Sequence, residues 1–114
     1  MSKRHDHFNK ERQRLNDLVL GSDDLNIKRF FALDDAVYRD GALDKKTKEL
    51  LGMVASLVLR CDDCVTYHIG QAKSCGVTDA EFTETMSVGL LVGGSITIPH
   101  IRRAFDLWNE LKQD

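Results

Sequence analysis

Apolar residues recur at intervals of three and four along nearly the whole 114-residue chain, which is the periodicity of amphipathic helices. Sheet proteins alternate apolar and polar residues instead, and the only such stretch here is SITI at 95–98, which is too short to build a sheet. With 42% hydrophobic residues and a single proline, the chain is expected to pack rather than to stay disordered. The sequence therefore predicts an all-α fold in one domain that spans residues 1–114.

Start and stop signals divide this pattern into about six helices. The expected breaks lie at Gly21, Gly41, Gly76 and Gly93–Gly94. Asp44 is expected to cap the third helix, and the TDAE sequence at 78–81 has the residues of a capping box for the fifth. Pro99 suits the first turn of the last helix. The second half of the third helix is apolar nearly all round, so this helix is expected to be buried on most sides.

The charge pattern excludes several classes of function. Acidic and basic residues are interspersed and the formal net charge is −2, whereas proteins that bind nucleic acids or anionic membranes concentrate Lys and Arg on one surface. The longest apolar run, Leu50–Leu59, has about half the length that a bilayer-spanning helix needs. The charged start of the sequence lacks the apolar centre of a signal peptide. We therefore expect a cytosolic protein without a nucleic-acid or membrane partner.

The sequence LRCDDCVTYH carries the strongest chemical signal. Three cysteines, two of them close together, indicate redox chemistry or metal binding in a cytosolic protein. At the start of a helix, Cys64 and His68 would lie on one face, about 5–6 Å apart at Cβ. Cys61 would lie at the helix N-terminus, where free amides and the dipole favour a thiolate. Asp62 and Asp63 oppose that effect unless they cap the helix, so the sequence leaves the net effect on the thiols open.

This spacing suits a pair that cycles between thiols and a disulfide. A disulfide needs Cβ atoms about 3.8 Å apart, closer than an undistorted helical turn provides, so a Cys61–Cys64 bond is expected to be readily reduced. His68 can take a proton from Cys64 and return it to a leaving group if a third group fixes its tautomer. The candidate is Glu49, about 18 Å from Cys61 along a continuous helix. A turn near Arg60 would bring Glu49 towards His68, with contact made directly after helix tilt or through a water.

Two other interpretations use the same residues. A Cys₃His zinc site would need Cys75 as its fourth ligand, but Cys75 lies about 10 Å beyond His68 along the same helix. We therefore expect no metal and no cofactor. Alternatively, the cysteines are small core residues and His68 is an internal, hydrogen-bonded histidine, in which case the protein is a helical assembly protein without catalysis.

Several further residues have a structural interpretation as their first one. His100 is expected at the surface or in a helix cap, although it could approach the site from another subunit. The Arg102–Arg103 pair is expected to be solvated, with binding of an anionic substrate as the alternative. Trp108, Phe30 and Phe31 are expected to be anchors of the core or of an interface.

Glu49, followed twelve residues later by Cys61-x-x-Cys64-x-x-x-His68 and then by the Gly76 turn, resembles the AhpD-like, carboxymuconolactone decarboxylase family. The resemblance runs from about residue 47 to residue 105, and the Glu49 spacing makes it more specific than a CxxC pair alone. It implies an all-α fold whose subunits assemble as trimers or hexamers, with the redox centre near a subunit interface. The lactone decarboxylases of the family generally lack the CxxC pair, so decarboxylation is not expected.

The resemblance also implies roles for the four candidate residues. In the peroxidase members, the cysteine that matches Cys64 attacks the peroxide, the one that matches Cys61 resolves the sulfenic acid, and the residues matching Glu49 and His68 relay the proton. Known peroxidase members carry a further histidine where this chain has Asp63, so part of their relay is absent. We expect a thiol-dependent oxidoreductase that reduces hydroperoxides, with disulfide reduction as the alternative. Its partners would be a small peroxide or disulfide substrate, a thiol reductant and further copies of the chain.

Overall fold

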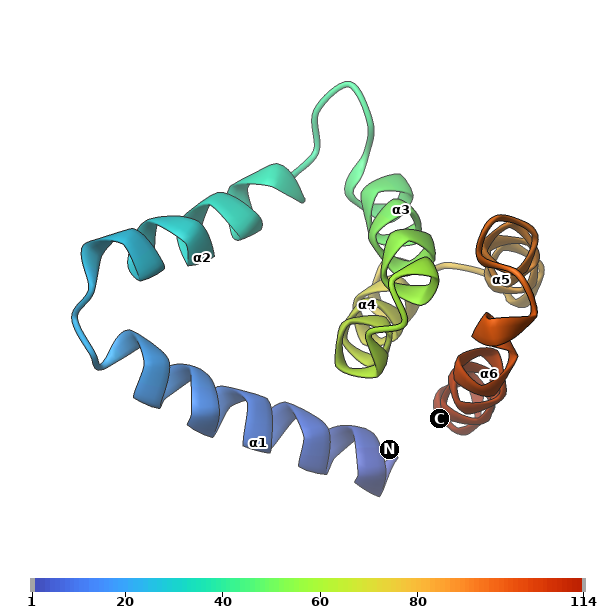
Figure 1. Ribbon diagram of the computed structural model, residues 1–114, viewed down its shortest axis with the longest axis horizontal. Helices are drawn as coiled ribbons and strands as arrows, with labels where there is room; N and C mark the ends of the chain where they lie inside the picture. Colours follow the sequence, from blue (N-terminus) through green and yellow to red (C-terminus); the bar gives the residue numbers. More distant parts are fainter. Residues whose placement is uncertain (1, 114) are drawn as a thin grey trace.

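All regular elements of the structure are helices (Figure 1). The structure is a computed structural model that describes residues 2–113, so the two end residues of the predicted domain lie outside the described part. Its elements are α1 (Lys3–Leu20), α2 (Leu25–Val37), α3 (Lys45–Val58), α4 (Asp62–Ser74), α5 (Asp79–Gly93), the short 3₁₀ helix η1 (Ser95–Thr97) and α6 (Ile98–Lys112). The all-α prediction is confirmed, and the SITI stretch begins with η1 instead of a strand. Among the described residues, no helix is both long and apolar enough to span a membrane.

The predicted helix starts are confirmed by their caps. Asp44 accepts a hydrogen bond from the Thr47 amide at the start of α3. Thr78 and Glu81 form both halves of a capping box at the start of α5, which satisfies amides that have no partner within the helix. One predicted end is wrong, because α2 stops at Val37 instead of continuing to Gly41.

The turn between α3 and α4 lies at the predicted place. Arg60 adopts a left-handed conformation with φ of 61°, and the amides of Arg60 and Cys61 donate to the carbonyl oxygens of Leu57 and Ser56. This hydrogen-bond pattern is that of a Schellman motif, which ends a helix and reverses the chain. As a result, α4 packs back along α3.

The core lies between α3, α4, α5 and α6 (Figure 1). Its largest buried apolar side chains include Met53, Leu57, Ile69, Phe82 and Met86. Phe82 stacks on Trp108 with ring centroids 4.6 Å apart, and the Trp108 indole N–H donates to Asp79 Oδ1 at 2.8 Å. The prediction that Trp108 anchors the core is therefore confirmed.

Helices α1 and α2 contribute no buried residue. They lie beside the bundle as an arm (Figure 1), and the start of α1 is held to α6 by hydrogen bonds from Ser2 to Glu110 and from Arg4 to Asp106. Several of their apolar side chains are open, with Leu18 65% and Phe30 69% exposed, whereas Phe31 is partly buried. Phe30 is therefore not part of the core.

Helix α3 is less enclosed than its sequence predicts. Met53 and Leu57 are fully buried against α4 and α5, but Leu51 is half exposed and Leu59, just past the end of the helix, is 77% exposed. The expectation that α3 is buried on most sides is therefore only partly met within one chain. An apolar sequence indicates that a surface will be covered but does not say whether the cover belongs to the same chain.

Candidate active site

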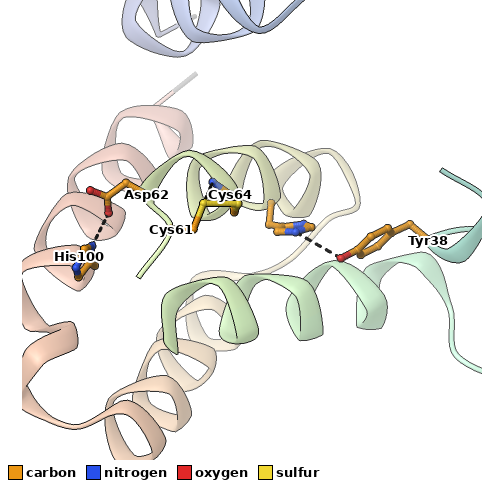
Figure 2. Close-up of a disulfide and its surroundings, with 6 residues drawn as sticks. Tyr38, Cys61, Asp62, Cys64 and His100 are labelled. Carbon is orange, nitrogen blue, oxygen red and sulfur yellow. Dashed lines mark hydrogen bonds and ion pairs between the residues drawn. A yellow bond between two sulfur atoms is a disulfide. The ribbon is translucent and has the colours of Figure 1, made fainter. Parts of the chain in front are cut away.

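Cys61 and Cys64 lie at the N-terminus of α4 and are joined by a disulfide (Figure 2). Cys61 is the N-cap residue, and its Sγ accepts a hydrogen bond from the Cys64 amide at 3.2 Å. Cys64 is exposed and Cys61 is partly exposed. The pair therefore occupies a helix N-terminus, where amides and the helix dipole stabilise negative charge. Cys64 is the more exposed of the two residues.

His68 lies one turn further along α4 and is only 7% exposed. Its Nδ1 is 2.7 Å from Oε1 of Glu49 on α3. A carboxylate can only accept hydrogen bonds, so Nδ1 carries a hydrogen and Nε2 is the nitrogen that can gain or lose a proton. The α3–α4 turn thus brings Glu49 and His68 into direct contact, without a bridging water.

Glu49 is a buried carboxylate with two donors. It is 1% exposed, and its second oxygen accepts a hydrogen bond from Lys45 Nζ at 2.9 Å. Burial by itself raises the pKa of Glu49, but the hydrogen bonds from His68 and Lys45 and the positive charge of these groups lower it below its usual value. Glu49 is therefore ionised at neutral pH and can stabilise a protonated His68.

Tyr38, the residue that follows α2, is a member of this cluster that the sequence analysis misses. Its hydroxyl lies 3.5 Å from Nε2 of His68, drawn as a dashed line in Figure 2, and the two rings are 5.3 Å apart. The Tyr67 ring packs edge to face against the His68 ring, with centroids 5.4 Å apart. The Arg12 guanidinium lies over the Tyr67 ring. Tyr38 lies 30 residues before His68 in the chain, so no local spacing could indicate this contact.

The first residue of α4 forms a second cluster beside the cysteines (Figure 2). Asp62 contacts His100 Nδ1 at 2.7 Å and Arg103 at 2.9 Å, both on α6. Burial raises the pKa of Asp62, but the hydrogen bonds from His100 and Arg103 outweigh burial and lower it. Of the two cases that the sequence left open for Asp62, the structure shows an ion pair with α6, and the N-cap of α4 is Cys61. Arg103 stays exposed, as expected, while it pairs with Asp62. His100 is only partly exposed and contacts Asp62 within its own chain.

A cavity of about 660 Å³ lies beside Cys64. Cys64 and His68 line it from α4, and α1 and α2 form its other walls. Its size lies within the range of pockets that bind small organic molecules, about 300–1,000 Å³. The remaining lining residues are Arg4, His7, Phe8, Glu11, Arg12, Leu15, Asn16, Asp34, Asp63 and Tyr67.

The third cysteine is separate from this site. Cys75 follows α4 at its C-terminal end, whereas Cys61 caps the N-terminal end, and Cys75 is a free thiol. Within residues 2–113, no three His, Cys, Asp or Glu side chains are arranged to hold a metal ion. The left-handed Gly76 that follows Cys75, with φ of 82°, ends α4 as the sequence predicts.

Residues 26–107 match the sequence model of the carboxymuconolactone decarboxylase family. This chain belongs to that family. A crystal structure of TM1620 from Thermotoga maritima is similar to it with 53% identity and a TM-score of 0.92, covering 94% of each chain. Another structure of TM1620, at 52% identity and a TM-score of 0.90, covers 94% of this chain and 91% of its own, and its name suggests an involvement in an antioxidative response.

A more distant structure of the carboxymuconolactone decarboxylase family has the same fold. The structure of apo-lpg0406 from Legionella pneumophila is 26% identical, with a TM-score of 0.86, and covers 96% of this chain and 98% of its own. An uncharacterised protein of the cox locus of Paracoccus denitrificans is 30% identical over 82 residues, which is 72% of this chain and 74% of that protein. The AhpD-like fold expected from the resemblance is therefore confirmed.

Proposed function

We propose that this protein is a cofactor-independent thiol oxidoreductase that reduces hydroperoxides through Cys64 and Cys61. The observation that carries the proposal is the arrangement of an exposed CxxC pair one helical turn from a buried Glu49–His68 pair. These residues supply a nucleophile, a resolving thiol and a base oriented by a third group, which are the components of covalent catalysis by a cysteine.

In the reduced protein, His68 accepts the proton of the Cys64 thiol, and the Glu49 carboxylate stabilises the resulting imidazolium. The thiolate attacks one oxygen of the hydroperoxide and the O–O bond breaks. Cys64 becomes a sulfenic acid, and the departing alkoxide takes the proton from His68 and leaves as an alcohol. The Cys61 thiol then attacks the Cys64 sulfur, a disulfide forms and water leaves. An external dithiol reduces this disulfide by thiol–disulfide exchange and completes the cycle.

Two features of the structure favour Cys64 as the attacking residue. Cys64 is exposed and lines the cavity, whereas Cys61 is less exposed and does not line it. Cys64 also lies on the same face of α4 as His68, one turn away. Asp63 occupies the position of the family's additional histidine and lines the cavity as well, so the proton relay in this chain would depend on the Glu49–His68 pair without a second histidine.

The proposal is tested by following thiol oxidation in a stopped-flow instrument. The reduced protein should react with hydrogen peroxide or an organic hydroperoxide at least tenfold faster than free cysteine at the same pH. Cys61→Ser should then retain a sulfenic acid on Cys64 that can be trapped by dimedone and located by mass spectrometry. Trapping on Cys61 in Cys64→Ser, with none on Cys64 in Cys61→Ser, would invert the two roles. Oxidation of both cysteines no faster than free cysteine would end the peroxidase proposal.

Disulfide reduction on the same centre is the second candidate, and the size of the cavity favours it. The 660 Å³ beside Cys64 is far more than the about 30 Å³ that one water molecule occupies in the liquid, so the cavity has room for a substrate larger than hydrogen peroxide, such as a disulfide. Slow oxidation by both peroxides together with fast reduction of a mixed disulfide would support this function instead. A purely structural role requires inert, buried cysteines, and Cys64 is exposed.

We further propose that the protein works as a homo-oligomer in the cytosol, where a thiol reductant keeps such pairs cycling. The apolar side chains along α1 and α2 support self-association, because monomeric proteins rarely expose large contiguous apolar patches. The dithiol that reduces the disulfide would come from a separate molecule.

A further inference from the structure

We infer that Tyr38 is a positioning residue of this site. Its hydroxyl orients the His68 ring through Nε2, while Glu49 accepts a hydrogen bond from Nδ1. The inference deepens the proposed function, because it assigns the partner of the nitrogen that would receive the proton of Cys64. It begins from the contact of the Tyr38 hydroxyl with His68 Nε2 at 3.5 Å.

The backbone on both sides of Tyr38 is held to α3 by one side chain. Lys48 Nζ donates hydrogen bonds to the carbonyl oxygens of Val37, at 2.8 Å, and of Arg39, at 2.7 Å. These are the residues immediately before and after Tyr38. The position of the tyrosine is therefore fixed from α3, the helix that also carries Glu49.

A glycine on α3 makes room for the contact. A Cβ atom at Gly52, one turn after Lys48, would lie 2.5 Å from the Tyr38 hydroxyl and 2.7 Å from Cε1 of His68. Since such distances are far below van der Waals contact, any larger residue at position 52 would push the two side chains away. Lys48, Glu49 and Gly52 thus place both partners of the imidazole from one helix.

A tyrosine hydroxyl can serve His68 in either protonation state. It donates a hydrogen bond to Nε2 when the imidazole is neutral and accepts one from Nε2–H when the ring is protonated. Burial, followed by the negative charges of Glu49 and Asp34, raises the pKa of Tyr38, so the hydroxyl keeps its own proton. Hydrogen bonds to charged groups are the stronger ones, and the hydroxyl therefore stabilises mainly the protonated ring.

Other titratable groups also surround the imidazole, and a test must separate Tyr38 from them. Besides Tyr38 and Glu49, they are Lys45 on α3, Asp34 on α2, Asp63, Cys64 and Tyr67 on α4, and Arg4, His7, Glu11 and Arg12 on α1, across the cavity. Tyr67 is the matched control, because its ring contacts His68 at a similar distance but no hydrogen bond joins its hydroxyl to the imidazole among the described contacts.

The test measures the rate at which iodoacetamide alkylates Cys64 in the reduced full-length protein as a function of pH, with the site mapped by mass spectrometry. Tyr38→Phe should move the midpoint of this profile upward by about 0.5 pH unit or more, which is about threefold less thiolate below the midpoint. The physical reason is that an imidazolium without its hydroxyl acceptor stabilises the thiolate less. Tyr67→Phe should leave the midpoint where it is in the wild type.

An unchanged or lowered midpoint in Tyr38→Phe, or an equal rise in Tyr67→Phe, would overturn the inference. If Tyr38→Phe does not fold, Lys48→Met tests the same contact by releasing the backbone around Tyr38. It should raise the midpoint in the same direction, and an unchanged midpoint in that variant would overturn the inference. Alkylation uses no peroxide, so the two proposals can fail separately. If the midpoint rises in Tyr38→Phe but the wild-type protein fails the peroxidase assay, the role of Tyr38 is supported and the proposed peroxidase function is contradicted.

Discussion

At the scale of single residues, the site depends on a carboxylate that is buried but charged. Glu49 is 1% exposed, and two donors, His68 and Lys45, stabilise its ionised form. The sequence predicted Glu49 and His68 as partners, because the family spacing and a turn near Arg60 bring them together. Neither Lys45 nor Tyr38 was predicted as a member of the site. In the sequence, Lys45 cannot be distinguished from an ordinary lysine on the exposed face of a helix, and Tyr38 lies 30 residues before His68.

Glu49→Gln should lower the free energy of unfolding at pH 7 by about 1–3 kcal/mol, because it removes a charged acceptor from a buried hydrogen bond. The lowered pKa of Glu49 fixes the sign of the pH dependence. The stabilisation is fully present above the unfolded-state pKa of about 4.3 and is lost as the pH falls through the lower folded-state pKa. Urea unfolding should therefore show a difference between wild type and variant that shrinks below about pH 4. Glu84→Gln, on the exposed face of α5, is the control and should stay close to wild type at both pH values.

At the scale of elements, the reversal between α3 and α4 decides whether the site forms. Caps at Asp44 and Thr78 were predictable because Asp and Thr have side chains that satisfy helix amides. The left-handed residue of the α3–α4 turn was not, since Gly fills this position in most Schellman motifs and here it is Arg60. The end of α2 was predicted too late, because Gly41 was the expected break and the helix ends at Val37. Lys48 binds the Val37 and Arg39 carbonyls there, a tertiary contact without a sequence signal.

Arg60→Gly should stabilise the protein relative to Arg60→Ala by about 1 kcal/mol, because a left-handed conformation is unfavourable for a residue with a Cβ atom and free of that penalty for glycine. The comparison with alanine removes the effect of losing the guanidinium. Chemical unfolding followed by circular dichroism at 222 nm would measure the difference. Equal stability of the two variants would show that the turn is not strained by the side chain at position 60.

At the scale of the whole molecule, the apolar pattern predicted six helices but not which of them would form the core. Met53, Phe82 and Trp108 lie inside the chain's own bundle, whereas Leu18 on α1 and Phe30 on α2 stay open. The apolar periodicity of these helices is similar. Periodicity predicts that one face of a helix is apolar, but it does not identify which element or which subunit packs against that face. The family resemblance supplies the missing part as an expectation, which is assembly into trimers or hexamers.

We expect the wild-type protein to sediment as a trimer or hexamer at micromolar concentration. Burial of the Leu18 and Phe30 side chains between subunits would supply a stabilisation of about 25 cal/mol for each Å² of apolar surface removed from water. The double variant Leu18→Glu, Phe30→Glu should sediment as a smaller species, because each subunit would place charges in this apolar contact. Lys10→Glu, an exposed change on α1, is the control and should leave the wild-type assembly intact. A wild-type protein that sediments as a monomer would contradict the prediction and would leave the open faces of α1 and α2 to a different partner.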